Sequence, residues 1–364
     1  EKLARALDIA SEAVADDATV LGYAREAAEI YGDRLDQPDQ AVPVLMRAIA
    51  LGDADRGLRA RLGDGLRVAG RTDEARVVLE ALITDYGRRR SPERAAAHLL
   101  LAKVLHAAGE REQALDQLEL AAGMDASNPA IMHMLAQTAR EDGQLDRAER
   151  SYRALLMLVR RPPDGEERTR SPIGAAQVLY ELATIARERG EQAQAQELVE
   201  SALEVIVHSD AEAPALQRVL QQRGDKALLR RVLELRLHNV DNRRRRAEVL
   251  ADLARAYAAD DDHDRAFEHY LLAIAADPGN PALNQEAREA AARSGHVQRY
   301  ADELEQQLEK ARRTSDVHVR CELLLRLAEV MERDWGDYER AADLLAQAEG
   351  TSVREVDVWR AAAR

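Results

Sequence analysis

The sequence predicts an all-α protein in which pairs of helices stack on one another as a solenoid. Small or apolar residues recur along its 364 residues at intervals of 34, 39, 34, 47, 34, 37, 34 and 41. Such a spacing is typical of two-helix units, because each unit buries its apolar face only against its neighbours. We call these nine residues the anchors: Ala41, Ala75, Ala114, Ala148, Ala195, Leu229, Ala266, Tyr300 and Ala341.

A turn residue lies five positions before every anchor. In two units it is an aspartate, Asp36 or Asp261, and in the other seven it is a glycine. Glycine adopts the positive φ that ends a helix sharply, and a small anchor lets the two helices approach closely. The pattern therefore predicts helix, turn, helix in each unit. The seven glycines are Gly70, Gly109, Gly143, Gly190, Gly224, Gly295 and Gly336.

The composition also favours helices over a sheet. Hydrophobic residues make up 46% of the chain but aromatic residues only 3%, so alanine and leucine provide most of the apolar surface. No segment alternates with the period of two that a half-buried strand requires. No apolar stretch approaches the ~20 residues of a membrane-spanning helix. Cys321 is the only cysteine and stands among leucines, so we expect a buried thiol and no disulfide within the chain.

The residues around the anchors resemble the tetratricopeptide repeat family, whose 34-residue pattern is W-x2-L-G-x2-Y, A-x3-F and P. The fourth and seventh units fit best, while Leu229 and Tyr300 replace the usual alanine in the sixth and eighth. The first and ninth units carry one extra residue in the first helix. The resemblance implies about nine repeats of antiparallel helices wound as a right-handed superhelix. The fourth unit fills the pattern with Met132, Leu135, Ala136, Ala139, Gly143, Ala148, Tyr152 and Leu155.

We expect residues 1–364 to form one array, cut from a longer one. Trp359 falls at the family's tryptophan position, and Leu3 and Leu7 resemble the second helix of a preceding unit, so both ends interrupt a repeat. Capping of the array by another kind of element is the alternative. The expected repeats are 21–55, 56–90, 91–128, 129–163, 172–209, 210–243, 244–280, 281–314 and 316–354, with partial repeats at 1–20 and 355–364.

The four longer joins between units are all rich in arginine. Insertions at equivalent joins of a solenoid map to one edge, so we expect a basic stripe there on a protein of net charge −14. An anionic partner is one interpretation of this stripe. Solvated loops whose arginines pair with neighbouring carboxylates are the other. The four joins are residues 86–94, 160–172, 239–246 and 310–316.

The resemblance places peptide binding in a groove lined by the first helices. In the family's register, the middle of this groove is basic, whereas Glu289, Glu329 and Glu332 make its C-terminal end acidic. The Lys and Asn set with which some members clamp a terminal carboxylate is missing. We expect an acidic peptide as partner, with ordinary exposed helix residues as the alternative. The expected contacts are Lys103, His106, His133, Gln137, Arg140, Tyr180, Arg187, Arg218 and Arg255.

The sequence gives no support for catalysis, a cofactor or a metal. Phosphate-binding and nucleophile motifs are missing, and the acidic run 260–264 lacks the glycine and distal glutamate of a calcium loop. The negative net charge argues against nucleic acid. We therefore expect a cytoplasmic, non-catalytic interaction scaffold, with the periplasm as the alternative compartment. The regulatory arm of a larger enzyme, such as a kinase or protease, is the alternative function. Arginine outnumbers lysine 48 to 4, which suggests a GC-rich bacterial genome.

Overall fold

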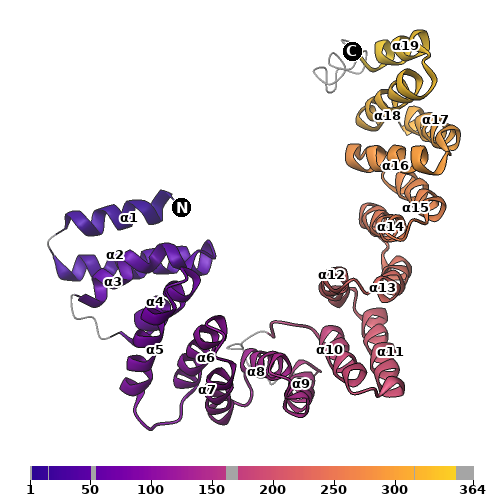
Figure 1. Ribbon diagram of the computed structural model, residues 1–364. Coiled ribbons are helices and arrows are strands. Elements are labelled where there is room, and N and C mark those ends of the chain that lie inside the picture. The colour runs from indigo at the N-terminus through magenta and orange to yellow at the C-terminus, as the bar shows by residue number, and fades with distance from the viewer. Residues whose placement is uncertain (1, 15, 51–54, 161–170, 315, 350–364) are drawn as a thin grey trace. The chain divides into compact units, whose positions relative to one another are not determined.

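The computed structural model describes residues 2–14, 16–50, 55–160, 171–314 and 316–349. These residues form nineteen α-helices and four short helical turns, and none of them lies in a strand (Figure 1). The chain divides into two compact units, unit 1 (Glu1–Val199) and unit 2 (Glu200–Arg364). The all-α stack of helix pairs predicted from the spacing is confirmed. Its arrangement as one continuous array stays a prediction.

Unit 1 contains an N-terminal helix followed by helix pairs. Consecutive helices pack against one another, from α1 on α2 to α9 on α10. The helix α11 (Gln192–His208) runs across the boundary between the units. The elements are α1 (Lys2–Ala13), α2 (Asp17–Glu29), η1 (Ile30–Arg34), η2 (Pro38–Ala41), α3 (Val42–Ala50), α4 (Arg56–Val68), α5 (Thr72–Tyr86), α6 (Pro92–Ala107), α7 (Arg111–Met124), α8 (Pro129–Glu141), α9 (Leu145–Arg160) and α10 (Ala175–Glu188).

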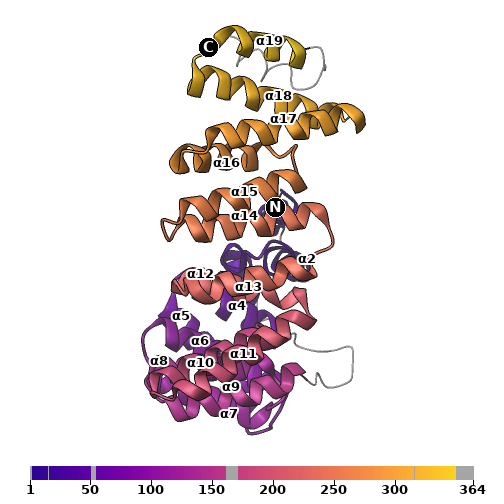
Figure 2. The same cartoon turned by 90° about the vertical axis from the view of Figure 1, so that its right-hand side faces the viewer.

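Unit 2 continues with the same alternation of first and second helices. Figure 2 shows its pairs α14–α15 and α16–α17 lying one above the other, and α17, α18 and α19 pack in sequence. The elements are η3 (Asp210–Glu212), α12 (Ala213–Arg223), α13 (Lys226–Asn239), α14 (Arg243–Ala258), α15 (His263–Ala276), α16 (Pro281–Ser294), α17 (Val297–Thr314), α18 (Val317–Val330), η4 (Met331–Trp335) and α19 (Tyr338–Glu349).

The turns within the helix pairs lie at the predicted positions. All seven predicted glycines have a positive φ, and so do Asp36 (54°) and Asp261 (58°), the non-glycine residues with this conformation in the described part of the chain. Aspartate tolerates the left-handed region because its short side chain bonds nearby backbone groups. Two of the shorter joins end at a proline that starts the next helix, Pro129 in α8 and Pro281 in α16.

The extra residue predicted in the first and ninth units is accommodated as a π-helical turn. In both units the first helix ends in such a turn, Ile30–Arg34 or Met331–Trp335. An i→i+5 hydrogen bond absorbs one inserted residue without breaking the helix. Leu35 N–H accordingly donates to Ile30 O at 3.0 Å. The two insertions therefore leave the anchor and the turn in register.

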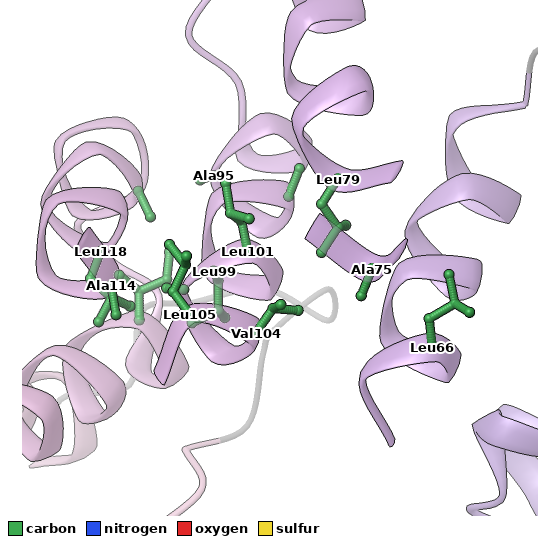
Figure 3. Packing of buried hydrophobic residues seen from close by; sticks show 14 of the residues in the cluster. Leu66, Ala75, Leu79, Ala95, Leu99, Leu101, Val104, Leu105, Ala114 and Leu118 are labelled. Atoms are coloured by element: carbon green, nitrogen blue, oxygen red, sulfur yellow. The ribbon is translucent and has the colours of Figure 1, made fainter. Parts of the chain in front are cut away.

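All nine anchors are buried, and none exceeds 7% exposure. Figure 3 shows the resulting packing in unit 1, where Ala75 and Leu79 of α5 and Ala114 and Leu118 of α7 lie on either side of α6. Tyr300 fits as an anchor because its hydroxyl donates to Asn284 O at 2.9 Å. Cys321 is buried, as predicted. The join at 161–170 and the segment around Trp359 lie outside the described residues.

Candidate interaction surface

The predicted groove residues lie on the first helices of the pairs, and we call the surface that these helices share the first-helix face. In unit 1 this face comprises the solvent-facing side chains of α4, α6, α8 and α10. Lys103 on α6, Gln137 on α8 and Thr184 on α10 occupy equivalent positions on successive helices, and each is half-buried. Lys103 has no acidic partner among the residues that the structure describes. Gln137 donates to Glu141 Oε1 at 3.1 Å, and Thr184 donates to Tyr180 O at 2.9 Å.

Polar side-chain contacts cross from one first helix of unit 1 to the next. His106 Nε2 on α6 lies 3.3 Å from Glu141 Oε2 on α8. Arg140 on α8 reaches α10, where its NH1 donates to Glu181 Oε2 at 2.9 Å and its NH2 to Glu188 Oε1 at 2.8 Å. The Glu181 side chain is only 6% exposed. Arg140 is therefore a contact between repeats as well as a predicted partner contact.

Three other predicted residues of unit 1 differ in exposure. Tyr180 is 3% exposed, so its ring belongs to the packing of α10 and offers no open surface in this conformation. Arg187 is exposed, and its guanidinium lies 6.0 Å from the Tyr180 ring centroid. His133 is half-buried. Burial lowers the pKa of His133 although the nearby carboxylate of Glu181 acts to raise it, and the imidazole is neutral at pH 7.

The same cross-helix pairing occurs in unit 2. Arg255 on α14 binds Glu286 on α16 through two hydrogen bonds of 2.9 Å and also donates to Asp252 at 2.7 Å. The hydrogen bond from Arg255, followed by that from Tyr270, offsets burial and lowers the pKa of Glu286. Arg218 on α12 is exposed, and its one described hydrogen bond is to Pro214 O of its own helix.

The acidic end of the predicted groove is also internally paired. Glu329 on α18 lies 2.9 Å from both Arg326 and Arg333 and 3.8 Å from Arg288 on α16. Glu289 lies 3.8 Å from Arg293. The side chains of opposite sign therefore compensate one another along this face. Sequence register located the cations, but it did not identify their partners Glu141, Glu181, Glu188 and Glu286 on the neighbouring first helices.

A recess opens on unit 1 between α2, η2, α3, α4 and α6. Its volume is about 250 Å³, and its lining combines apolar residues such as Ala41, Leu45 and Leu100 with the charged residues Asp36 and Arg61. Asp64 on α4 lies at its rim and is paired with Arg67 at 2.8 Å. At roughly 30 Å³ per water molecule, the recess has room for one side chain of a bound peptide.

The arginines of the joins behave differently from those of the first-helix face. Arg88, Arg89 and Arg90 before α6 are exposed, as are Arg243 to Arg245 at the start of α14. Within the described part of the chain, no ion pair engages Arg243, Arg244 or Arg245. The fourth arginine of that run, Arg246, donates to Leu237 O at 2.9 Å. The second interpretation of the stripe, pairing with nearby carboxylates, therefore fails for this join.

Metal-binding clusters and membrane-spanning helices are both missing from the described ranges. No group of three or more His, Cys, Asp or Glu side chains is arranged to hold a metal ion there. None of the helices described is both long enough and apolar enough to cross a membrane.

Comparison with protein families identifies one repeat directly. Residues 247–280 match the model of the tetratricopeptide repeat, and they correspond to α14 and α15, the seventh predicted unit. This segment is a tetratricopeptide repeat. The anchors and positive-φ turns place the other helix pairs in the same register, so the described chain contains about nine tetratricopeptide-like repeats. The match lies within the predicted repeat 244–280.

Solved structures of other repeat proteins are similar at low identity. MamA 41-end from Desulfovibrio magneticus RS-1 is 15% identical, with 53% of this chain and 98% of that chain covered and a TM-score of 0.43. The C-terminal part of a TPR repeat-containing protein from Cytophaga hutchinsonii is 16% identical, with 73% and 98% covered and a TM-score of 0.43. A putative kinesin light chain from Podospora anserina is 20% identical, with 60% and 92% covered and a TM-score of 0.36. No curated protein matches the chain significantly.

Proposed function

We propose that this protein is a non-catalytic interaction scaffold that holds a peptide of a partner protein on the first-helix face of unit 1. The observation that carries the proposal is the row formed by Lys103, Gln137 and Thr184. These polar side chains lie at equivalent positions on three successive first helices, and each is half-exposed. Repeat solenoids characteristically use such a continuous surface for binding extended chains. We assign this activity to the cytoplasm.

The row is suited to a polar peptide because its hydrogen bonds can be exchanged. Gln137 donates to Glu141 of its own helix at 3.1 Å, and Thr184 donates to Tyr180 O of its own helix at 2.9 Å. A bound peptide can replace these bonds without separating two repeats. Lys103 supplies a cation for an acidic side chain of the peptide, and the apolar recess near Leu100 takes a neighbouring side chain.

Arg140 and Arg255 have a different role in this proposal. Each already binds a carboxylate of the next first helix, so an acidic peptide has to compete with Glu181 or Glu286 for it. We propose that these two arginines set the spacing of the first helices and thereby align the peptide-binding row. Direct charge contacts with the peptide come from Lys103, with a contribution from Arg187.

The test is a selection of peptides displayed on phage against the purified protein, followed by affinity measurements with three forms. Lys103→Glu reverses a cation of the row. Arg150→Glu makes the same charge change on the exposed surface of the second helix α9 and is the matched control. We expect Lys103→Glu to weaken the selected peptides about tenfold and Arg150→Glu to change affinity less than twofold. Equal affinities for all three forms would place binding elsewhere and overturn the proposal.

A further inference from the structure

One edge of unit 2 carries cations that the protein itself does not neutralise. We call Arg243, Arg244, Arg245, Lys310 and Arg313 the edge cluster. The three arginines begin α14, and the other two residues end α17. All five side chains are exposed. Among the residues that the structure describes, none of the five has an acidic partner.

Most other arginines of unit 2 are paired. Arg231, Arg299 and Arg340 bind carboxylates of a neighbouring second helix at 2.8, 2.7 and 2.9 Å. On the first-helix face, Arg255 and Arg288 bind carboxylates of the next first helix. The protein is also acidic overall, with 66 Asp and Glu against 52 Lys and Arg. Unpaired cations at this edge are therefore not explained by a shortage of carboxylates.

The position of the three arginines is unfavourable for α14 itself. The first turn of a helix carries partial positive charge and prefers acidic residues. The first turn of α14 contains no acidic residue and begins Arg243, Arg244, Arg245, Arg246. Asn242 caps this turn by accepting from Arg245 N–H at 3.1 Å, which does not offset the side-chain charge. Arginines therefore occupy a helix start that favours acidic side chains, and no contact in the described structure compensates for this. Such a departure from the local preference is expected at functional residues.

The two parts of the edge cluster lie along the same edge. In unit 2 each second helix ends, and each following first helix begins, on this edge (Figure 2). The joins stack closely, because a Cβ added to Gly279 between α15 and α16 would lie 3.0 Å from Val319 on α18. One join, between α15 and α16, lies between the start of α14 and the end of α17 along this edge.

We propose that the edge cluster binds an extended, acidic segment of a partner protein, separately from the first-helix face. Carboxylates every second or third residue would meet Arg243 to Arg245 at one end and Lys310 with Arg313 at the other. The exposed positions of the cluster include no aromatic side chain, which disfavours the base stacking of single-stranded nucleic acid. The acidic remainder of the protein also repels a nucleic acid, whose backbone carries one charge per residue along its whole length.

The probe is a fluorescein-labelled peptide of eight glutamates, measured by anisotropy with the full chain. Arg244→Glu should weaken the peptide at least threefold, and the triple reversal of Arg243, Arg244 and Arg245 should weaken it about tenfold or more. Arg293→Glu is the matched control, because this exposed arginine lies at the opposite end of α16, roughly 20 Å from the edge. Raising NaCl from about 50 to 300 mM should weaken the parent more than the triple variant.

Thermal unfolding of the same variants separates binding from folding. The triple reversal should leave the Tm unchanged or raise it, since it removes repulsion at the start of α14. No binding of the peptide, equal loss with Arg293→Glu, or a lowered Tm of the triple variant would overturn the proposal. Tighter binding of oligothymidylate or of phosphatidylserine vesicles than of the peptide would overturn the assignment to an acidic protein segment. The affinity measurement with Lys103→Glu is independent of this experiment, because it uses different peptides and a residue of unit 1. The proposal for the edge cluster therefore stands even if Lys103→Glu has no effect.

Discussion

Arg255 on α14 and Glu286 on α16 are joined by two parallel hydrogen bonds of 2.9 Å, which connect the first helices of successive repeats. Tyr270 on α15 adds a third bond by donating its hydroxyl to Glu286 Oε2 at 2.9 Å. One carboxylate thus ties together three helices of two repeats. Its surroundings resemble those of Glu181 in unit 1, which receives Arg140 from the preceding repeat.

Glu286→Gln should destabilise unit 2 by about 1 kcal/mol at pH 7, the size expected for a charged hydrogen-bond network that is partly exposed. The folded-state pKa of Glu286 lies below its usual value. Its stabilising effect is therefore present above the unfolded pKa of about 4.3 and is lost as the pH falls through the lower folded value. Urea titrations of parent and variant should differ at pH 7 and converge toward pH 3. If the parent and Glu286→Gln differ in stability by the same amount at pH 7 and pH 3, the ionised carboxylate of Glu286 is not the source of the stabilisation.

Ala148→Leu should destabilise unit 1 by roughly 1–3 kcal/mol, because the anchor is fully buried where α8 and α9 meet and an added isobutyl group overpacks this contact. Ala154→Leu on the exposed side of α9 is the control and should change the stability by less than ~0.5 kcal/mol. Urea midpoints of the two variants give the comparison. Similar midpoints would count against the repeat register.

Gly65→Ala and Gly123→Ala should have opposite effects on stability. A Cβ at Gly65 would lie 2.5 Å from the backbone oxygen of Pro38, which cannot move aside without shifting η2. A Cβ at Gly123 in α7 meets no atom within 4 Å. We expect a loss of about 1–3 kcal/mol for Gly65→Ala and a gain of roughly 0.5 kcal/mol for Gly123→Ala. Thermal melts of the two variants test whether Gly65 on the first helix α4 lies this close to Pro38 in η2.

His98 should make unit 1 less stable in mild acid. Burial lowers the pKa of His98, although its hydrogen bond with Gln117 acts in the opposite direction. The unfolded chain, with a histidine pKa near 6.5, then binds more protons below that pH, so stability falls as the pH decreases through this range. His98→Leu should reduce the difference in urea midpoint between pH 7.5 and pH 5.5. If the urea midpoint falls by the same amount in the parent and in His98→Leu, groups other than His98 cause the loss of stability in acid.

The turns and anchors could be predicted from the sequence because local chemistry determines them. A positive φ admits few residue types, so Gly143 or Asp261 identifies the turn directly. A close helix crossing favours a small residue such as Ala148, and the spacing between such residues gives the length of the repeat. Even the π-turn at Met331 was visible as one surplus residue in the pattern.

The electrostatics of the first-helix face could not be predicted in the same way. Helical register shows that Arg140 is directed toward this face, but its partners Glu181 and Glu188 lie 41 and 48 residues later, beyond an insertion of irregular length. Which carboxylate a guanidinium reaches depends on the relative rotation of two helices, and a 34-residue pattern does not specify this. Tyr180 was placed on the correct helix but proves to be buried.

The central claim is that arginines of the first-helix face hold repeats together, whereas arginines of the edge cluster do not. Thermal unfolding of Arg140→Glu and Arg244→Glu tests it most directly, because both variants make the same charge change. Arg140→Glu places a second carboxylate beside the buried Glu181 and should lower the Tm by several degrees, while Arg244→Glu should leave it unchanged or raise it. Equal losses of Tm, or a loss only in Arg244→Glu, would contradict the account.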